Sequence, residues 1–175
     1  MEAPTPERET HEHAVLTSRS RHRLSHHHRP STIRAQVCGQ PRDRDGRYHR
    51  RDAGLSGALS TKSRVDFEKH CVRAGGMSLS PPAPTALRFC TIGSFIEYVT
   101  TLTDEIDERI WDPEVKVHDV GNLATVWAPF RAKINGVVDH VGAKLFVLHK
   151  MNGEWKVTGL ADSCRRPTEE EMQMK

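Results

Sequence analysis

Three long runs of alternating apolar and polar residues dominate the C-terminal half of the chain. The dipeptides Asn135-Gly136 and Asn152-Gly153 separate these runs, which span about residues 122–134, 137–150 and 154–164. Alternation with a period of two is typical of strands with one buried face. Asn-Gly favours a two-residue type I′ turn, because both central residues of that turn need a positive φ. The pattern therefore predicts two consecutive β-hairpins.

The predicted turns also fix which side chains share each face of the sheet. A two-residue turn at Asn135-Gly136 places Phe130 opposite Val141 and Trp127 opposite Lys144. One face is then the apolar, concave one, and it carries Ala124, Val126, Ala128, Phe130, Val141, Ala143, Leu145, Val147 and Leu160, with Asp162 near its end. The other face carries Trp127, Arg131, His140, Lys144, Phe146, Ser163 and Arg165. A β-bulge would slip the register by one residue and exchange the faces locally.

One helix is expected to cover the concave face. Residues 94–106 place Phe95, Ile96, Val99, Leu102 and Ile106 on one apolar stripe, and Ser94 with Glu97 forms a capping box. Residues 108–117 read as a strand in which Pro113 requires an edge or a bulge. Residues 65–72 fit a helix end or a first strand, and a turn-rich connector follows from Gly75 to Pro84. The predicted class is α+β, with a strongly curved antiparallel sheet on helix 94–106.

Composition divides the chain into three parts. Residues 1–63 are rich in Arg, His, Ser and Pro and lack a helical or strand period, so we expect them to be disordered. Residues 1–64 hold 13 basic and 7 acidic residues, a net charge of +6, whereas the remainder carries −3. The folded domain is expected at residues 65–167, followed by an acidic tail at 168–175. Four scattered cysteines and the absence of a long apolar run favour a cytoplasmic protein with reduced thiols and no membrane span.

The basic segment is a weak candidate for two kinds of ligand. Consecutive histidines at 26–28 bind metals adventitiously, whereas a structural zinc site needs four preoriented ligands, so no metal site is expected. Arginine-rich arms bind phosphate backbones, but here acidic residues are interleaved, and Tyr48 is the single aromatic residue before Phe67. Nucleic acid is therefore an unlikely partner.

Two residues stand out as candidates for acid–base chemistry. Asp162 lies among apolar neighbours, which would raise its pKa and suit it to proton transfer; the alternative is a salt bridge to Arg165, Arg166 or Arg109. His140 lies across from Arg131 and Arg165, which would keep it neutral and suit it to an acidic ligand; the alternative is a polar surface patch. Asp139 and His140 are adjacent on one strand, so they are expected to point to opposite faces.

The second face combines aromatic and charged residues, as many interfaces do. Trp127, Arg131, Lys144 and Phe146 would form this patch, and we expect a homodimer that buries the tryptophan. A second core layer is the alternative.

Several sequence strings together resemble the SnoaL-like branch of the nuclear transport factor 2-like superfamily over about residues 65–170. The strings are Glu108-Arg109-Ile110-Trp111-Asp112-Pro113, Leu123 to Phe130 with its Trp-Ala-Pro-Phe motif, His140-Val141-Gly142, and Gly153-Glu154-Trp155-Lys156-Val157. The resemblance implies a cone-shaped α+β domain with a pocket and with chemistry that needs no metal or cofactor. It also implies N-terminal helices that close the cone, and residues 1–63 do not look like them.

The functional expectation is a pocket protein for a small apolar or amphipathic molecule. Its pocket would contain Phe130, Val141, Leu145, Leu160 and Arg109, with Asp162 and His140 as candidate catalytic residues. The activity would be that of a cofactor-independent lyase or isomerase acting on a secondary metabolite. Since superfamily members also include proteins without catalysis, a homodimeric binding or interaction domain is the alternative.

Overall fold

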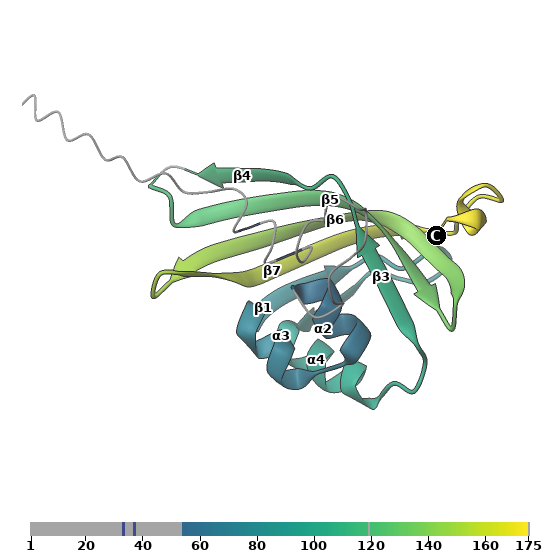
Figure 1. Ribbon diagram of the computed structural model, residues 1–175, viewed down its shortest axis with the longest axis horizontal. Coiled ribbons are helices and arrows are strands. Elements are labelled where there is room, and N and C mark those ends of the chain that lie inside the picture. Colours follow the sequence, from purple (N-terminus) through teal and green to yellow (C-terminus); the bar gives the residue numbers. More distant parts are fainter. Residues whose placement is uncertain (1–32, 34–36, 38–53, 119, 175) are drawn as a thin grey trace, which may run out of the picture.

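Over residues 54–118 and 120–174, three α-helices pack against one face of a curved, seven-stranded sheet (Figure 1). The structure, a computed structural model, describes residues 33, 37, 54–118 and 120–174. The elements in chain order are α2 (Leu55–Thr61), α3 (Arg64–His70), β1 (Cys71–Leu79), β2 (Arg88–Thr91), α4 (Ile92–Thr101), β3 (Ile106–Ile110), β4 (Glu114–His118), β5 (Leu123–Ile134), β6 (Val137–Met151), β7 (Glu154–Arg165) and the short 3-10 helix η1 (Glu171–Gln173). The α+β class and the curved sheet are confirmed.

The two predicted hairpins form the centre of the sheet. Asn135 and Gly136 have φ values of 52° and 82°, and Asn152 and Gly153 have 53° and 87°, as type I′ turns require. The strand order is β2-β1-β7-β6-β5-β3, and β4 also pairs with β5. The predicted strand at 108–117 is thus two strands, β3 and β4, which pair with successive parts of β5 on either side of Pro113.

The expectation of a purely antiparallel sheet is wrong at β1. This strand runs parallel to β7, and it contains Gly75 and Gly76, which were expected in a turn-rich connector. A Cβ on Gly75 would lie 2.4 Å from the carbonyl oxygen of Thr158, so a glycine lets β1 approach β7 closely. Gly75 therefore marks a close contact between β1 and β7.

A β-bulge at Asp139 overturns most of the predicted face assignment. Val137 and Val138 pair with β5 as the turn predicts, but His140 then pairs with Ala132, which leaves Asp139 as the extra residue. From there on β6 is shifted by one, so Phe130 faces Gly142 rather than Val141, and Trp127 faces Leu145 rather than Lys144. The inner face, toward the helices, therefore carries His140, Lys144, Phe146 and Leu148, whereas the outer face carries Val141, Ala143, Leu145 and Val147.

A second bulge, at Thr158, adjusts the register of β6 and β7. Val147 pairs with Gly159 and Leu148 with Val157, so that Leu145 faces Ala161 and not Leu160. Trp155, Val157 and Leu160 consequently join the core beneath the helices.

Helix α4 begins earlier and ends earlier than the predicted helix 94–106. Its N-cap is Thr91, whose hydroxyl accepts a hydrogen bond from the Ser94 amide, so the expected Ser94–Glu97 capping box does not form. Glu97 instead pairs with Arg64 and Arg73 on neighbouring elements. Leu102 is extended, and Ile106 begins β3, where it is buried.

Part of the N-terminal prediction is wrong as well. Helix α2 lies inside the segment 1–63 that was expected to be disordered, and α2 and α3 precede β1, where the helices of the cone were expected to be missing. Ile33 and Val37 are also helical and fully buried. Residues 1–32, 34–36 and 38–53, including the histidines at 26–28, lie outside the described residues.

The C-terminal tail is held at one end of the sheet. The two terminal guanidinium nitrogens of Arg165 donate to Glu171 at 2.7 Å, and the Thr168 amide donates to the same carboxylate. The Arg165 hydrogen bonds, followed by that from Thr168, lower the pKa of Glu171 to about 2. Among the described residues, no helix is long and apolar enough to cross a membrane.

Candidate functional site

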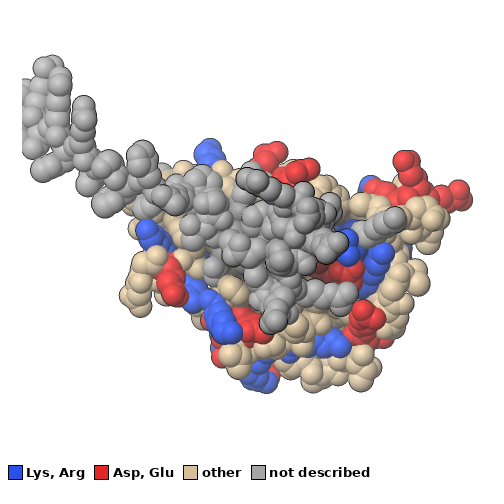
Figure 2. All heavy atoms as spheres, in the orientation of Figure 1, with Lys and Arg blue, Asp and Glu red and all other residues tan. Residues whose placement is uncertain are grey.

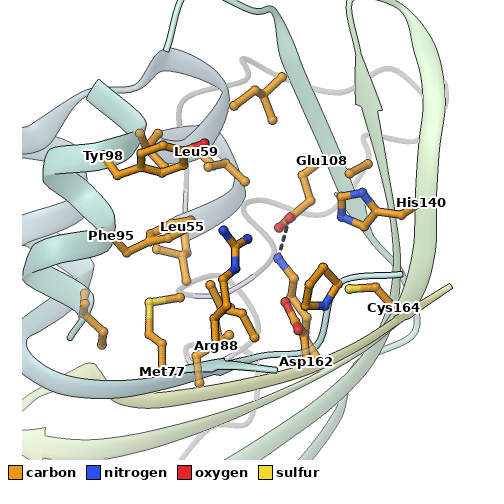
Figure 3. A pocket seen from close by; sticks show the side chains of 18 of the residues that line it. Leu55, Leu59, Met77, Arg88, Phe95, Tyr98, Glu108, His140, Asp162 and Cys164 are labelled. Atoms are coloured by element: carbon orange, nitrogen blue, oxygen red, sulfur yellow. Dashed lines mark hydrogen bonds and ion pairs between the residues drawn. The ribbon is translucent and has the colours of Figure 1, made fainter. Parts of the chain in front are cut away.

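A cavity of about 300 Å³ lies between the helices and the inner face of the sheet. Its volume is at the small end of typical ligand pockets, which hold about 300–1,000 Å³. One end is apolar and is lined from α2, α4 and β1 by Leu55, Leu59, Met77, Phe95, Tyr98 and Val99. The opposite end is polar and is lined by Arg88, Glu108, Asp139, His140, Lys144, Asp162 and Cys164. Figure 3 shows the apolar residues that it labels on one side of the space and Glu108, His140, Asp162 and Cys164 on the other, with Arg88 between them.

Asp139 and His140 form a hydrogen-bonded pair at the polar end. Nδ1 of His140 lies 2.8 Å from Oδ2 of Asp139, and Oδ1 of Asp139 accepts a 3.2 Å bond from Arg166. The expectation that the two residues point to opposite faces is wrong, because the bulge at Asp139 breaks the alternation of β6. The imidazole also contacts the Phe130 ring edge-on, with centroids 5.6 Å apart.

A buried ion pair lies beside this dyad. Nζ of Lys144 bonds Oε2 of Glu108 (dashed in Figure 3), and the two side chains are only 10% and 7% exposed. The ammonium also lies 4.4 Å from the centroid of the Phe130 ring, within the range of a cation–π contact. Lys144 and His140 therefore both contact the Phe130 ring.

Asp162, on β7, lies at the polar end of the cavity and connects β7 to the end of β1. Its Oδ1 accepts a 2.7 Å hydrogen bond from the Ser80 amide, just after β1, and the Cys164 amide donates to the Ser80 carbonyl at 3.0 Å. Burial, followed by the charge of Asp162, raises the pKa of the Cys164 thiol to about 12. The three arginines considered as partners of Asp162 pair elsewhere: Arg165 with Glu171, Arg166 with Asp139 and Arg109 with Asp107.

The structure brings some of the predicted site residues together and separates others. Asp162, His140 and Leu160 line the cavity, and Phe130 is buried against His140 and Lys144. Three predicted pocket residues lie on the outer side of the sheet, namely Val141, Leu145 and Arg109, because the register shift moves the first two and Arg109 alternates with Glu108.

The predicted interface patch divides in the same way. Lys144 and Phe146 are on the inner face, so they cannot belong to an outer contact surface. Trp127 is on the outer face and 44% exposed, but its cross-strand neighbour is Leu145. Arg131 is buried and bonds the Asp107 carbonyl and carboxylate. His140 was predicted to lie across from Arg131 and Arg165, but it lies on the opposite face of the sheet from both.

Four charged residues of the cavity escaped the sequence reasoning: Arg88, Glu108, Asp139 and the inner-facing Lys144. One signal pointed to Glu108, since Ile106, Glu108 and Ile110 alternate along one short strand and so share its buried side. The position of Lys144 depends on the bulge.

Within the described residues, no group of three His, Cys, Asp or Glu side chains is placed to hold a metal ion. Figure 2 shows Lys and Arg interspersed with Asp and Glu over the described part of the visible face.

Comparison with solved structures finds the same fold in other proteins. A nuclear transport factor 2-like superfamily protein from Salmonella enterica subsp. enterica serovar Typhimurium str. LT2 aligns with a TM-score of 0.50 and 14% identity, over 65% of this chain and 84% of that one. A protein of unknown function from Mycobacterium tuberculosis aligns with a TM-score of 0.50 and 12% identity, over 65% and 67%. No protein-family model and no curated protein matches the sequence. At these identities the likeness establishes the fold.

Proposed function

Starting from the nuclear transport factor 2-like fold, which this chain has, we propose that the protein binds a small amphipathic molecule and catalyses its elimination or isomerisation without a cofactor. One observation carries the proposal: the Asp139–His140 dyad lies at the polar end of a cavity whose opposite end is apolar. This activity corresponds to a lyase or isomerase of SnoaL-like type.

The dyad supplies a base with a defined orientation. An Nδ1–H donated to the Asp139 carboxylate leaves the Nε2 lone pair of His140 to accept a proton. Arg166 fixes the carboxylate from its other oxygen, so the imidazole is oriented before a ligand arrives. This is the arrangement in which a carboxylate positions a histidine base and stabilises the imidazolium that forms.

The proposed reaction is proton transfer next to a carbonyl group. His140 removes a proton from the carbon beside the carbonyl, and the Lys144 ammonium stabilises the negative charge that develops on the carbonyl oxygen. The imidazolium then returns its proton to a leaving hydroxyl, which departs as water, or to another carbon, which gives an isomer. Asp162 remains the second candidate for proton transfer, but one of its oxygens already accepts the Ser80 amide.

A β-hydroxyketone tests the elimination directly. The aldol of benzaldehyde and acetone is small and amphipathic, and its dehydration product, benzylideneacetone, is followed by ultraviolet absorbance. We expect the full chain to accelerate this dehydration, and His140→Gln to lower the rate by on the order of 10²–10⁴-fold. Asp139→Asn should lower it less, since the base remains but loses its orientation. His149→Gln is the matched control, because His149 is exposed and bonds Thr158 away from the cavity. An unchanged rate in His140→Gln would contradict the proposal.

A second candidate function rests on the outer face. Trp127 and Leu145 are cross-strand neighbours, 44% and 42% exposed, and together they form an apolar surface on the centre of the sheet. Such a surface supports a homodimeric binding or interaction domain. The two functions are compatible, because the cavity lies on the inner face of the sheet.

A further inference from the structure

Lys144 has surroundings that a purely structural lysine does not need. Lysine is rarely buried unless it is paired, and a buried ion pair adds little stability compared with apolar residues of similar volume. Here the pair of Lys144 with Glu108 lines the cavity, where a ligand would meet the ammonium directly. Nζ of Lys144 lies over the apolar Phe130 ring, and His140 contacts the same ring.

We propose that Lys144 is a nucleophile that forms an imine with an aldehyde or ketone bound in the cavity. This inference deepens the proposed function and rests on it, because it replaces the electrostatic role of the Lys144 ammonium with a covalent bond to the carbonyl carbon of the same substrate. Lysine amines form such imines when they are desolvated or have a neighbouring group that takes the proton.

Glu108 provides that neighbouring group. The ammonium of Lys144 transfers one proton to the Glu108 carboxylate, which converts the ion pair into a neutral amine and a neutral acid. A ligand that displaces water favours this transfer, because separated charges are costly in an apolar space. The amine then adds to the carbonyl carbon and forms a C–N bond. Protonated Glu108 returns its proton to the oxygen, which becomes a hydroxyl. The Glu108 carboxylate then takes one proton from the nitrogen and passes it to that hydroxyl, so the C–O bond breaks, water leaves, and a protonated imine remains beside the Glu108 carboxylate.

The imine makes the reaction of His140 easier. A protonated imine draws electrons from the adjacent carbon more strongly than a ketone does, so the proton on that carbon becomes more acidic. Phe130 contacts both Lys144 and His140, which places the imine and the base against the same ring. The cavity volume of about 300 Å³ limits the carbonyl compound to a small molecule with an apolar body that can reach toward Tyr98 and Phe95.

Reductive trapping on the full chain tests the imine independently of turnover. Benzylacetone, a ketone without a leaving hydroxyl, is incubated with the protein and sodium cyanoborohydride, and the adduct is mapped by peptide mass spectrometry. We expect one adduct per chain at Lys144, and on the order of tenfold less trapping in Lys144→Arg. Glu108→Gln should slow trapping, whereas Lys116→Arg, at an exposed lysine of β4, should leave it unchanged.

A competition experiment on the unmutated chain tests the imine even if Lys144→Arg fails to fold. The alcohol obtained by reducing benzylacetone cannot form an imine, and in excess it should protect Lys144 of the unmutated chain from trapping. An adduct spread over exposed lysines, or one that survives in Lys144→Arg, overturns the imine. His140→Gln separates the two proposals: trapping that persists while dehydration is lost supports both. Dehydration that requires His140 without any adduct at Lys144 refutes the imine alone, and an adduct without a His140-dependent rate refutes the elimination alone.

Discussion

The buried pair of Lys144 and Glu108 allows a sharp prediction about stability. Replacing Lys144 by Met keeps the side-chain length but leaves the Glu108 carboxylate uncompensated, and Glu108→Leu leaves the ammonium uncompensated. Both side chains are at most 10% exposed, so the remaining charge is poorly hydrated. Breaking a buried pair from one side costs about 3–5 kcal/mol. Since the cavity admits some water, we expect each single variant to lose about 3 kcal/mol, at the lower end of that range.

The double variant Lys144→Met/Glu108→Leu decides what causes the loss. Both charges are then absent, and apolar side chains replace a buried pair at little cost. We expect the double variant to be more stable than either single variant, with a coupling energy of about 2 kcal/mol or more. Equilibrium unfolding in urea gives these free energies, with the fluorescence of the buried Trp155 as the signal.

The surface pair of Lys69 and Asp66 is the matched control. It has the same charges at a spacing of three residues on α3, but Lys69 is 62% exposed, so its coupling should be far smaller. Single variants of the buried pair that are as stable as the unmutated chain would refute the reasoning. So would a double variant whose loss equals the sum of the single losses.

Three further predictions concern other parts of the molecule. Gly142→Ala should cost about 3 kcal/mol or more in urea unfolding, because the added Cβ would lie 1.9 Å from a backbone carbonyl oxygen of β7; a loss similar to that of Gly76→Ala, where nothing lies within 4 Å, would contradict this. Cys71 and Cys164, whose thiol pKa values burial raises to about 12, should react with iodoacetamide at pH 8 far more slowly than N-acetylcysteine, as mass spectrometry would show, and labelling at the rate of the free thiol would disprove their burial. The unmutated chain should sediment as a homodimer at tens of micromolar, a concentration estimated from ordinary interfaces, and Trp127→Glu should sediment as a monomer; a monomeric unmutated chain would refute the outer-face contact.

Local sequence predicted the parts of the fold that depend on local chemistry. The two Asn-Gly turns and the three strands beside them were predicted to within a residue or two, because positive φ and strict alternation leave few alternatives. The parallel pairing of β1 with β7 could not be predicted in this way, since it depends on contacts between residues more than 80 positions apart. Helix α4 was shifted for a similar reason, because Arg64 and Arg73 compete for Glu97 and Thr91 provides the cap.

The site was predicted less well than the fold, and a single position explains most of the difference. Asp162, His140 and Leu160 were assigned to the site and line the cavity, whereas Val141 and Leu145 were assigned to it and lie outside. The turn at Asn135-Gly136 determines the register only as far as Val138. The strand must bend beyond that point to curve around the helices, and the bulge that bends it has no signature in the neighbouring residues.

The bulge at Asp139 has a consequence for how this protein can diverge. Deleting that one codon would close the bulge but leave Val138 opposite Lys133 and His140 opposite Ala132, so His140, Lys144 and Phe146 would still face the cavity. The deletion would remove only the carboxylate that bonds the His140 imidazole. A one-codon insertion or deletion at this position can therefore add or remove the acidic partner of a histidine without rearranging the rest of the cavity. A point substitution in a regular strand could not do this, because adjacent residues there face opposite sides of the sheet.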